Sequence, residues 1–354
     1  MHPEGGSTLD EGLRNVVAVI FIAMMLLFAG CLNENPNGWA FELTQIDKMK
    51  SLGFDGEGVR IGIVDTGVDI DHVNMDRDKL VAWLDLINDN NEPYDDNGHG
   101  TFITALLLSK GGDLFGSGIE GICPDSQIVV VKAVSDTGYT NDTLISEAID
   151  FCIQKDVDII LLSLYKNPET INIGNKTMEK CEEAIDRGIF LVAPAGDDGV
   201  KDDGDVFELA GIDETIGVGS ISKNLYISTF SSKGNQALVP GKHEAREDPN
   251  KKPELVAPGE DIESITGWAS VIKSGTSISA AFIAGSLALL LEAYPDLKKS
   301  GKEGIEKVKE VLAKTAKKVG GEEIYWGNGL KHNDRYGYGL IQVYDAYVKL
   351  GEST

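Results

Sequence analysis

Residues 59–67 read Val-Arg-Ile-Gly-Ile-Val-Asp-Thr-Gly, an apolar and largely β-branched run that ends in a carboxylate, Asp65. Runs of this kind, without polar alternation, are typical of strands buried on both faces of a parallel sheet. Similar runs occur at residues 127–133, 158–164 and 189–193. Helical patterns lie between them, at residues 101–109, 142–155 and 175–187. The alternation predicts an α/β fold, a doubly wound and mostly parallel sheet with helices on both faces.

The length and composition predict one large domain. The chain has 354 residues, of which 42% are hydrophobic, enough for a substantial core. A long apolar helix is expected at residues 276–294 and an amphipathic helix at 304–319. We therefore expect a single domain over residues 39–350, preceded by a polar, turn-rich linker at 32–38. We expect a monomer.

The charge of the chain excludes some partners. Lys and Arg number 32 against 57 Asp and Glu, which gives a formal net charge of −25. Such an acidic chain repels nucleic acid phosphates and anionic lipid head groups. Nucleic acid is therefore not an expected partner, and charge will not bring the protein to a membrane.

The first 31 residues predict export. Residues 16–30 form an apolar run that follows Arg14 and is short for a bilayer span, as in the core of a signal peptide. The run ends Phe-Ala-Gly-Cys at residues 28–31, which resembles a lipobox and makes Cys31 a lipidation candidate. An uncleaved signal anchor is the alternative. Either way we expect an extracytoplasmic protein, secreted or held on the outer face of the cell membrane by its N-terminus.

Three further cysteines, Cys123, Cys152 and Cys181, are too few for a disulfide scaffold and lack zinc-site spacing. One disulfide plus a free thiol, or three buried thiols, are both compatible with the sequence.

Asp65 begins the first of three motifs, Asp65-Thr66-Gly67. It stands at the carboxyl end of a predicted strand, where ligand sites of open α/β sheets lie. Asp-Thr-Gly also marks aspartic proteases, and a second copy occurs at residues 136–138. Those enzymes are mostly antiparallel β, so the alternating α/β pattern argues against that alternative.

The second and third motifs contain a histidine and a serine. His99 stands between Gly98 and Gly100 just before a predicted helix, and histidine is the natural general base near neutral pH. Ser277 opens the long apolar helix at 276–294. It is either a helix cap or a nucleophile activated by a histidine that a carboxylate orients.

The chain order Asp, His, Ser is that of the subtilisin arrangement, not of chymotrypsin or α/β-hydrolases. The segments at 65–67, 99–101 and 275–277 resemble the three signatures of the subtilase family. Weaker resemblances lie at residues 121–124, 230–232, 252–259 and 336–339. The similarity covers about residues 39–350.

The resemblance implies a subtilisin-like fold and a serine endopeptidase that forms an acyl-enzyme on peptide or protein substrates. Together with the signal-like N-terminus, it predicts an exported enzyme. In such a mechanism Ser277 attacks, His99 transfers the proton, and Asp65 orients His99. It also implies a substrate-binding groove, whose residues would be Ser163, Leu164, Tyr165 and Gly196.

Asp197 departs from the family pattern, which has an asparagine at this oxyanion-hole position. An ionised carboxylate cannot donate a hydrogen bond and repels a developing oxyanion, whereas a protonated one can donate. This leaves an alternative function, a catalytically impaired subtilase-fold peptide-binding protein tethered to the membrane. No cofactor and no metal are expected. A structural calcium has no support, because Asn74 stands where Asp is usual and residues 109–120 do not match a calcium loop.

Overall fold

Seven parallel strands form the central sheet in the described part of the chain. The computed structural model describes residues 15–17, 19–20, 35–71, 74, 76–111, 118–164, 173–199, 204–236, 245–267 and 269–352. The strands are β1 (Arg60–Asp65), β2 (Leu80–Asp85), β3 (Gln127–Lys132), β4 (Ile159–Leu162), β5 (Phe190–Pro194), β6 (Ile216–Ile221) and β7 (Leu255–Pro258). The predicted α/β fold with a parallel sheet is confirmed.

The order of the strands is β2-β3-β1-β4-β5-β6-β7, and each neighbouring pair is parallel. After β3 the chain crosses β1 and continues with β4 on its other side. The order therefore reverses at β1, and the crevice outside the carboxyl end of such a strand is where open α/β sheets bind ligands.

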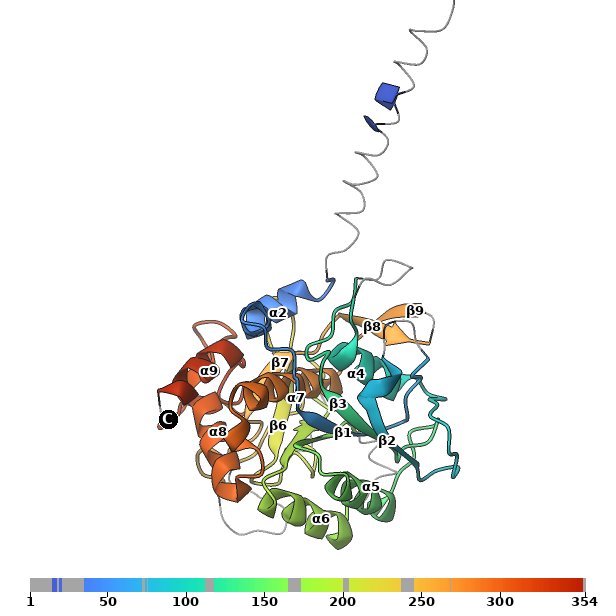
Figure 1. Ribbon diagram of the computed structural model, residues 1–354. Helices are drawn as coiled ribbons and strands as arrows, with labels where there is room; N and C mark the ends of the chain where they lie inside the picture. Colours follow the sequence, from blue (N-terminus) through green and yellow to red (C-terminus); the bar gives the residue numbers. More distant parts are fainter. Residues whose placement is uncertain are drawn as a thin grey trace, which may run out of the picture.

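Helices cover both faces of the sheet. On one face lie α4 (His99–Leu108) and α7 (Thr276–Ala293), and on the other lie α5 (Asp142–Gln154) and α6 (Asn175–Asp186) (Figure 1). Towards the C-terminus α8 (Gly301–Thr315) packs against α6 and α9 (Val343–Gly351). Double coverage explains why the strands are apolar on both sides.

Helix α7 is apolar because it lies in the core. It is long and apolar enough to cross a membrane, but 89% of it is buried inside the protein. It packs against β4, β5, β6 and β7. Its first turn, which contains Ser277, lies at the same edge of the sheet as the end of β1.

The sequence did not predict the strands β2, β6 and β7 or the helix α9, and several small elements also lie outside the predicted pattern. The antiparallel hairpin of β8 (Ile262–Thr266) and β9 (Ala269–Lys273) packs against α4, and the short helices α2 (Gly38–Thr44) and α3 (Ile46–Ser51) begin the domain. These segments are too short to give a clear hydrophobic period. The 3-10 turns Arg77–Lys79 and Pro295–Leu297 were likewise not predicted.

The other predicted elements are present with ends shifted by a few residues. The largest shift is in α8, which begins at Gly301 and ends at Thr315. The three cysteines after Cys31 are free, buried thiols. Burial raises the pKa of each to about 12, so none is a thiolate near neutral pH.

Candidate active site

Asp65 is the last residue of β1 and is completely buried. Its carbonyl oxygen accepts hydrogen bonds from the backbone of Ala133 and Val134, which extends the pairing of β1 with β3. The backbone N–H of Thr66 donates to the Asp65 carboxylate at 2.7 Å. The strand thus delivers a rigidly held carboxylate to the carboxyl edge of the sheet.

His99 is the first residue of α4, and the glycines beside it have separate roles. Gly98 precedes the helix with φ of 87°, a left-handed conformation that side chains disfavour. A Cβ on Gly100 would collide with the carbonyl oxygen of Gly67. The two glycine-containing motifs therefore pack directly against each other, which brings His99 to Asp65. The sequence predicted the helix from residue 101, and it begins two residues earlier.

Asp65, His99 and Ser277 form a continuous row of hydrogen-bonded side chains. Nδ1 of His99 lies 2.8 Å from Oδ1 and 3.0 Å from Oδ2 of Asp65, and Nε2 lies 3.0 Å from Oγ of Ser277. An ionised carboxylate only accepts hydrogen bonds, so Nδ1 donates and Nε2 is left to accept from the hydroxyl. This arrangement can remove the hydroxyl proton as the oxygen attacks an electrophile.

The charges around His99 favour its protonated form. Burial alone lowers the pKa of His99, but the charge of Asp65 and its hydrogen bond outweigh burial and raise the pKa above its usual value. The positive charge of Lys273 acts in the opposite direction. A neutral imidazole that can act as a base is therefore present above this raised pKa.

Asp197 follows β5 and binds the first turn of α7. Its Oδ1 accepts hydrogen bonds from the backbone N–H and the hydroxyl of Thr276, both at 2.8 Å. The backbone N–H of Gly196 donates to the same hydroxyl at 3.2 Å. A Cβ built on Gly275 would lie 3.4 Å from Oγ of Ser277 and 3.5 Å from Oδ2 of Asp197. The second carboxylate oxygen and the Ser277 hydroxyl therefore both lie beside Gly275.

Burial raises the pKa of Asp197 above its usual value, against the opposing effects of its two hydrogen bonds from Thr276 and of the nearby His99. The neutral acid is thus present at higher pH than for an exposed aspartate.

The profile of the subtilase family matches residues 56–339. The chain belongs to the subtilase family.

Several curated subtilases are similar to this chain. Subtilisin DY of Bacillus licheniformis is 26% identical over 82% of this chain and 95% of its own length. The thermophilic serine proteinase of Bacillus sp. (strain AK1) is 28% identical over 82% of this chain, and the match spans 61% of that protein. An intracellular serine protease of Paenibacillus polymyxa is 29% identical over 73% of both chains. The chain is a subtilisin-like serine endopeptidase, and its substrates are peptides or proteins.

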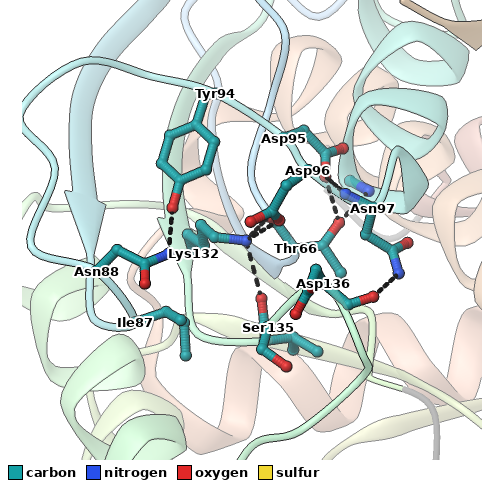
Figure 2. Close-up of polar contacts among 12 residues, drawn as sticks. Thr66, Ile87, Asn88, Tyr94, Asp95, Asp96, Asn97, Lys132, Ser135 and Asp136 are labelled. Carbon is teal, nitrogen blue, oxygen red and sulfur yellow. Dashed lines mark hydrogen bonds and ion pairs between the residues drawn. The ribbon is translucent and has the colours of Figure 1, made fainter.

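Membership of the subtilase family excludes the aspartic protease alternative. The second Asp-Thr-Gly copy lies in an exposed turn after β3, and the carbonyl oxygen of Asp136 accepts a hydrogen bond from the Asn97 side chain at 2.8 Å. The copy thereby supports the loop before His99 through its backbone (Figure 2).

Asp95 ties the Asp65 and His99 motifs of this subtilase together. Its carboxylate accepts hydrogen bonds from the Thr66 hydroxyl at 2.9 Å, from the Gly98 backbone at 2.8 Å, and from the backbone and hydroxyl of Thr101 at 2.8 and 2.7 Å. Burial alone would raise the pKa of Asp95, but the hydrogen bonds from Gly98 and Thr101 lower it. Asp95 therefore stays ionised and holds the turn in front of α4.

Lys132 also stabilises the turn in front of α4. Its fully buried ammonium group donates to the carbonyl oxygen of Thr66 at 2.6 Å, to Asp96 at 2.7 Å and to the carbonyl oxygen of Val134 at 3.2 Å. It also lies 5.2 Å from the ring centre of Tyr94. Figure 2 shows the ammonium group at the centre of these contacts. One buried cation thus joins the segment after Asp65 to the segment before His99.

Asp95 and Lys132 were not among the predicted site residues, although the sequence contains a signal for each. Lys132 is the one charged residue in the run 127–133, and a charge at the end of a buried strand requires a partner. Asp95 precedes His99 by four residues, the distance at which a carboxylate can bind the first turn of a helix.

The remaining predicted residues fall into two groups. Ser163 and Leu164 directly follow β4, beside β1, and both are buried. Tyr165 and Cys31 lie outside the described residues. Among the residues that the structure describes, no group of three or more His, Cys, Asp or Glu side chains is placed to hold a metal ion.

Proposed function

We propose that this subtilase is an exported, membrane-tethered endopeptidase that hydrolyses peptide bonds through an acyl-enzyme, with Asp65, His99 and Ser277 as its catalytic triad. The observation that carries the proposal is the unbroken row of hydrogen bonds from a buried carboxylate through an imidazole to a serine hydroxyl. The three side chains come from β1, α4 and α7, so only the fold brings them within reach.

In this mechanism Ser277 Oγ attacks the scissile carbonyl carbon while His99 Nε2 takes the hydroxyl proton. Asp65 accepts the Nδ1 hydrogen bond and stabilises the imidazolium that forms. His99 then gives the proton to the leaving amine, the C–N bond breaks, and an ester to Ser277 remains. A water molecule, deprotonated by His99, hydrolyses this ester and restores the serine.

The negative charge on the attacked carbonyl oxygen needs donors. The backbone N–H of Ser277, in the first turn of α7, is one, because this N–H has no partner within its own helix. We assign the second position to Asp197, which donates only when it is neutral. Turnover then requires neutral His99, present above its pKa, and neutral Asp197, present below its pKa. Because activity is lost as pH rises through the pKa of Asp197, we expect a maximum displaced toward acid pH.

Substrate binding by backbone pairing is the simplest use of the segment after β4. In our proposal an extended peptide adds as a strand beside Ser163 and Leu164, with Tyr165 and Gly196 lining the groove near the scissile bond. Main-chain pairing of this kind gives affinity with little sequence preference.

The proposed export and tethering rest on the N-terminal sequence. Residues 16–30 supply an apolar segment and Cys31 a lipidation candidate. The relatives include both subtilisins and an intracellular protease, so the compartment is an independent part of the proposal.

An active-site probe tests the function. A fluorophosphonate should label the wild-type protein and should not label Ser277→Ala, and peptide cleavage should follow the labelling. Asp197 favours one competing function, a peptide-binding protein with little turnover. Tight peptide binding without labelling at any pH from acid to alkaline would establish that alternative and overturn the triad.

A further inference from the structure

The start of the domain is fastened to the hairpin β8–β9. Asn37 is almost fully buried, and its side-chain amide donates to the Glu263 carbonyl oxygen at 2.7 Å. The amide oxygen of Asn37 accepts from the Glu263 backbone N–H at 3.1 Å. Asn37 thus pairs with β8 through both polar groups, as a neighbouring strand would. The chain enters the domain at a fixed point.

This entry point lies close to the proposed catalytic groups. Three residues after Glu263, the Thr266 side chain lies 3.5 Å from the position of a Cβ on Gly98, the residue before His99. At the rise of a β-strand, three residues span about 10 Å. In Figure 1, α2, β8, β9 and α4 lie on one side of the molecule, opposite α5 and α6.

The other strand of the hairpin reaches the site from the same side. The ammonium group of Lys273 lies 5.4 Å from the ring centre of Phe102 in the first turn of α4, and its charge acts on His99. Next to it Ile272 is 63% exposed. The hairpin therefore spans the distance from the point of entry to the catalytic edge and presents an apolar side chain outward.

The tether between this entry point and the proposed anchor is short. Cys31 precedes Asn37 by six residues. A fully extended chain of this length spans about 20 Å at most. The limit is similar for a lipid on Cys31 and for an uncleaved apolar segment that ends at Gly30. In both cases the hairpin cannot move farther than this from the bilayer surface.

We propose that the tether holds the His99–Ser277 edge of the sheet beside the bilayer, so that this subtilase cleaves the membrane-proximal segments of other membrane-anchored proteins. The inference rests on the anchor and triad proposed above. An enzyme and a scissile bond held at the same height in one membrane meet at a high effective concentration. With a net charge of −25, charge cannot hold the protein at an anionic surface, so the tether sets the distance.

The test exchanges spacer lengths between enzyme and substrate. The full-length protein, with its anchor, is reconstituted in phosphatidylcholine vesicles with a single-span substrate that carries one cleavable sequence. That sequence is first chosen as one that the enzyme hydrolyses as a soluble peptide. It follows the span either after a short Gly/Ser spacer or after a rigid helical spacer of about 60 residues, roughly 90 Å long.

The unmodified enzyme should cleave the short-spacer substrate at least tenfold faster. Insertion of the same rigid spacer between Leu32 and Asn33, which leaves the Asn37 contacts intact, should reverse this preference. Both enzymes should hydrolyse the soluble peptide at the same rate.

Three results would overturn the inference, and each has a separate cause. Equal cleavage of both substrates by a vesicle-bound enzyme that hydrolyses the soluble peptide contradicts the distance argument alone. Recovery of the enzyme in the soluble fraction, and not with the vesicles, contradicts the proposed N-terminal anchor. Hydrolysis of the soluble peptide that persists in Ser277→Ala contradicts the proposed triad.

Discussion

The two sides of Ser277 differ in how completely they are prepared for peptide hydrolysis. On one side, His99 and Asp65 continue an unbroken row of hydrogen bonds from the serine hydroxyl. On the other side, one oxygen of Asp197 binds Thr276, and in our proposal the Asp197 carboxyl group occupies the position of a donor to the developing oxyanion. The difference indicates that proton transfer and charge stabilisation are set separately here. In our proposal the fold geometry supplies proton transfer, and charge stabilisation depends on a single proton on Asp197.

The largest effect should come from the side of Ser277 that is hydrogen bonded to His99 and Asp65. Ser277→Ala should lower kcat by about 10⁶, as loss of the nucleophile or base does in subtilisin. Ser279→Ala is the matched control, because Ser279 lies in the same helix and donates only to the Ala257 carbonyl oxygen at 3.0 Å. Steady-state peptide hydrolysis measures both variants. Similar losses in the two would show that the helix, and not the hydroxyl of Ser277, is responsible.

The second effect concerns Asp197, on the other side of Ser277. In Asp197→Asn the amide oxygen can keep the hydrogen bonds from Thr276, and the NH₂ group replaces the second carboxylate oxygen. The asparagine donates at every pH, whereas wild-type Asp197 loses its proton as pH rises through its raised pKa. We therefore expect a gain in kcat of about 10² at alkaline pH, within the range for one oxyanion donor, and a smaller gain toward acid pH.

Asp198→Asn is the control for this substitution, since Asp198 binds the Ser232 hydroxyl instead of Thr276. A pH profile of kcat for the three proteins decides the matter. Lower activity of Asp197→Asn at all pH values would mean that residue 197 does not serve the oxyanion.

A smaller effect should come from Lys132, which supports the segments that hold Asp65 and His99. Lys132→Met removes the cation that joins the segments after Asp65 and before His99, so the alignment of the two should loosen. We expect a loss in kcat/KM of about tenfold, because small displacements of reacting groups are costly. Wild-type KM would indicate that the loss lies in the chemical step.

Lys252→Met provides the comparison for Lys132→Met. Lys252 is another fully buried lysine; it donates to the Thr215 carbonyl oxygen at 2.6 Å and to Glu254, away from the site. Both variants should have a lower Tm, but only Lys132→Met should lose activity per folded molecule. If the two lose activity equally, Lys132 has no positioning role beyond stability.

The smallest effect concerns the charge around His99. Lys273 lowers the pKa of His99 against the stronger opposing influence of Asp65. Lys273→Met should therefore raise this pKa and move the acid limb of the kcat/KM profile to higher pH, since activity appears as His99 loses its proton. Lys223→Met is the control, because Lys223 also lies over an aromatic ring, that of Trp39 at 5.7 Å. An unchanged acid limb in Lys273→Met would contradict the effect.

The sequence by itself determined the family and the parallel sheet. Buried strands such as β1 are continuous apolar runs, and the three glycine-flanked motifs are local enough to be recognised without a structure. Their glycines, among them Gly98 and Gly100, are required by the local backbone conformation and by close packing. These motifs can therefore be recognised directly in the sequence.

Only the tertiary structure decided what surrounds these motifs. Lys132 and Thr66 are far apart along the chain, as are Asn37 and Glu263, and no local pattern predicts that such residues touch. Their contacts exist because β3 lies beside β1 and because the hairpin β8–β9 folds back over α4. The physical reason is that strand pairing and helix packing bring distant segments together, whereas periodicity records only which face of each segment is buried.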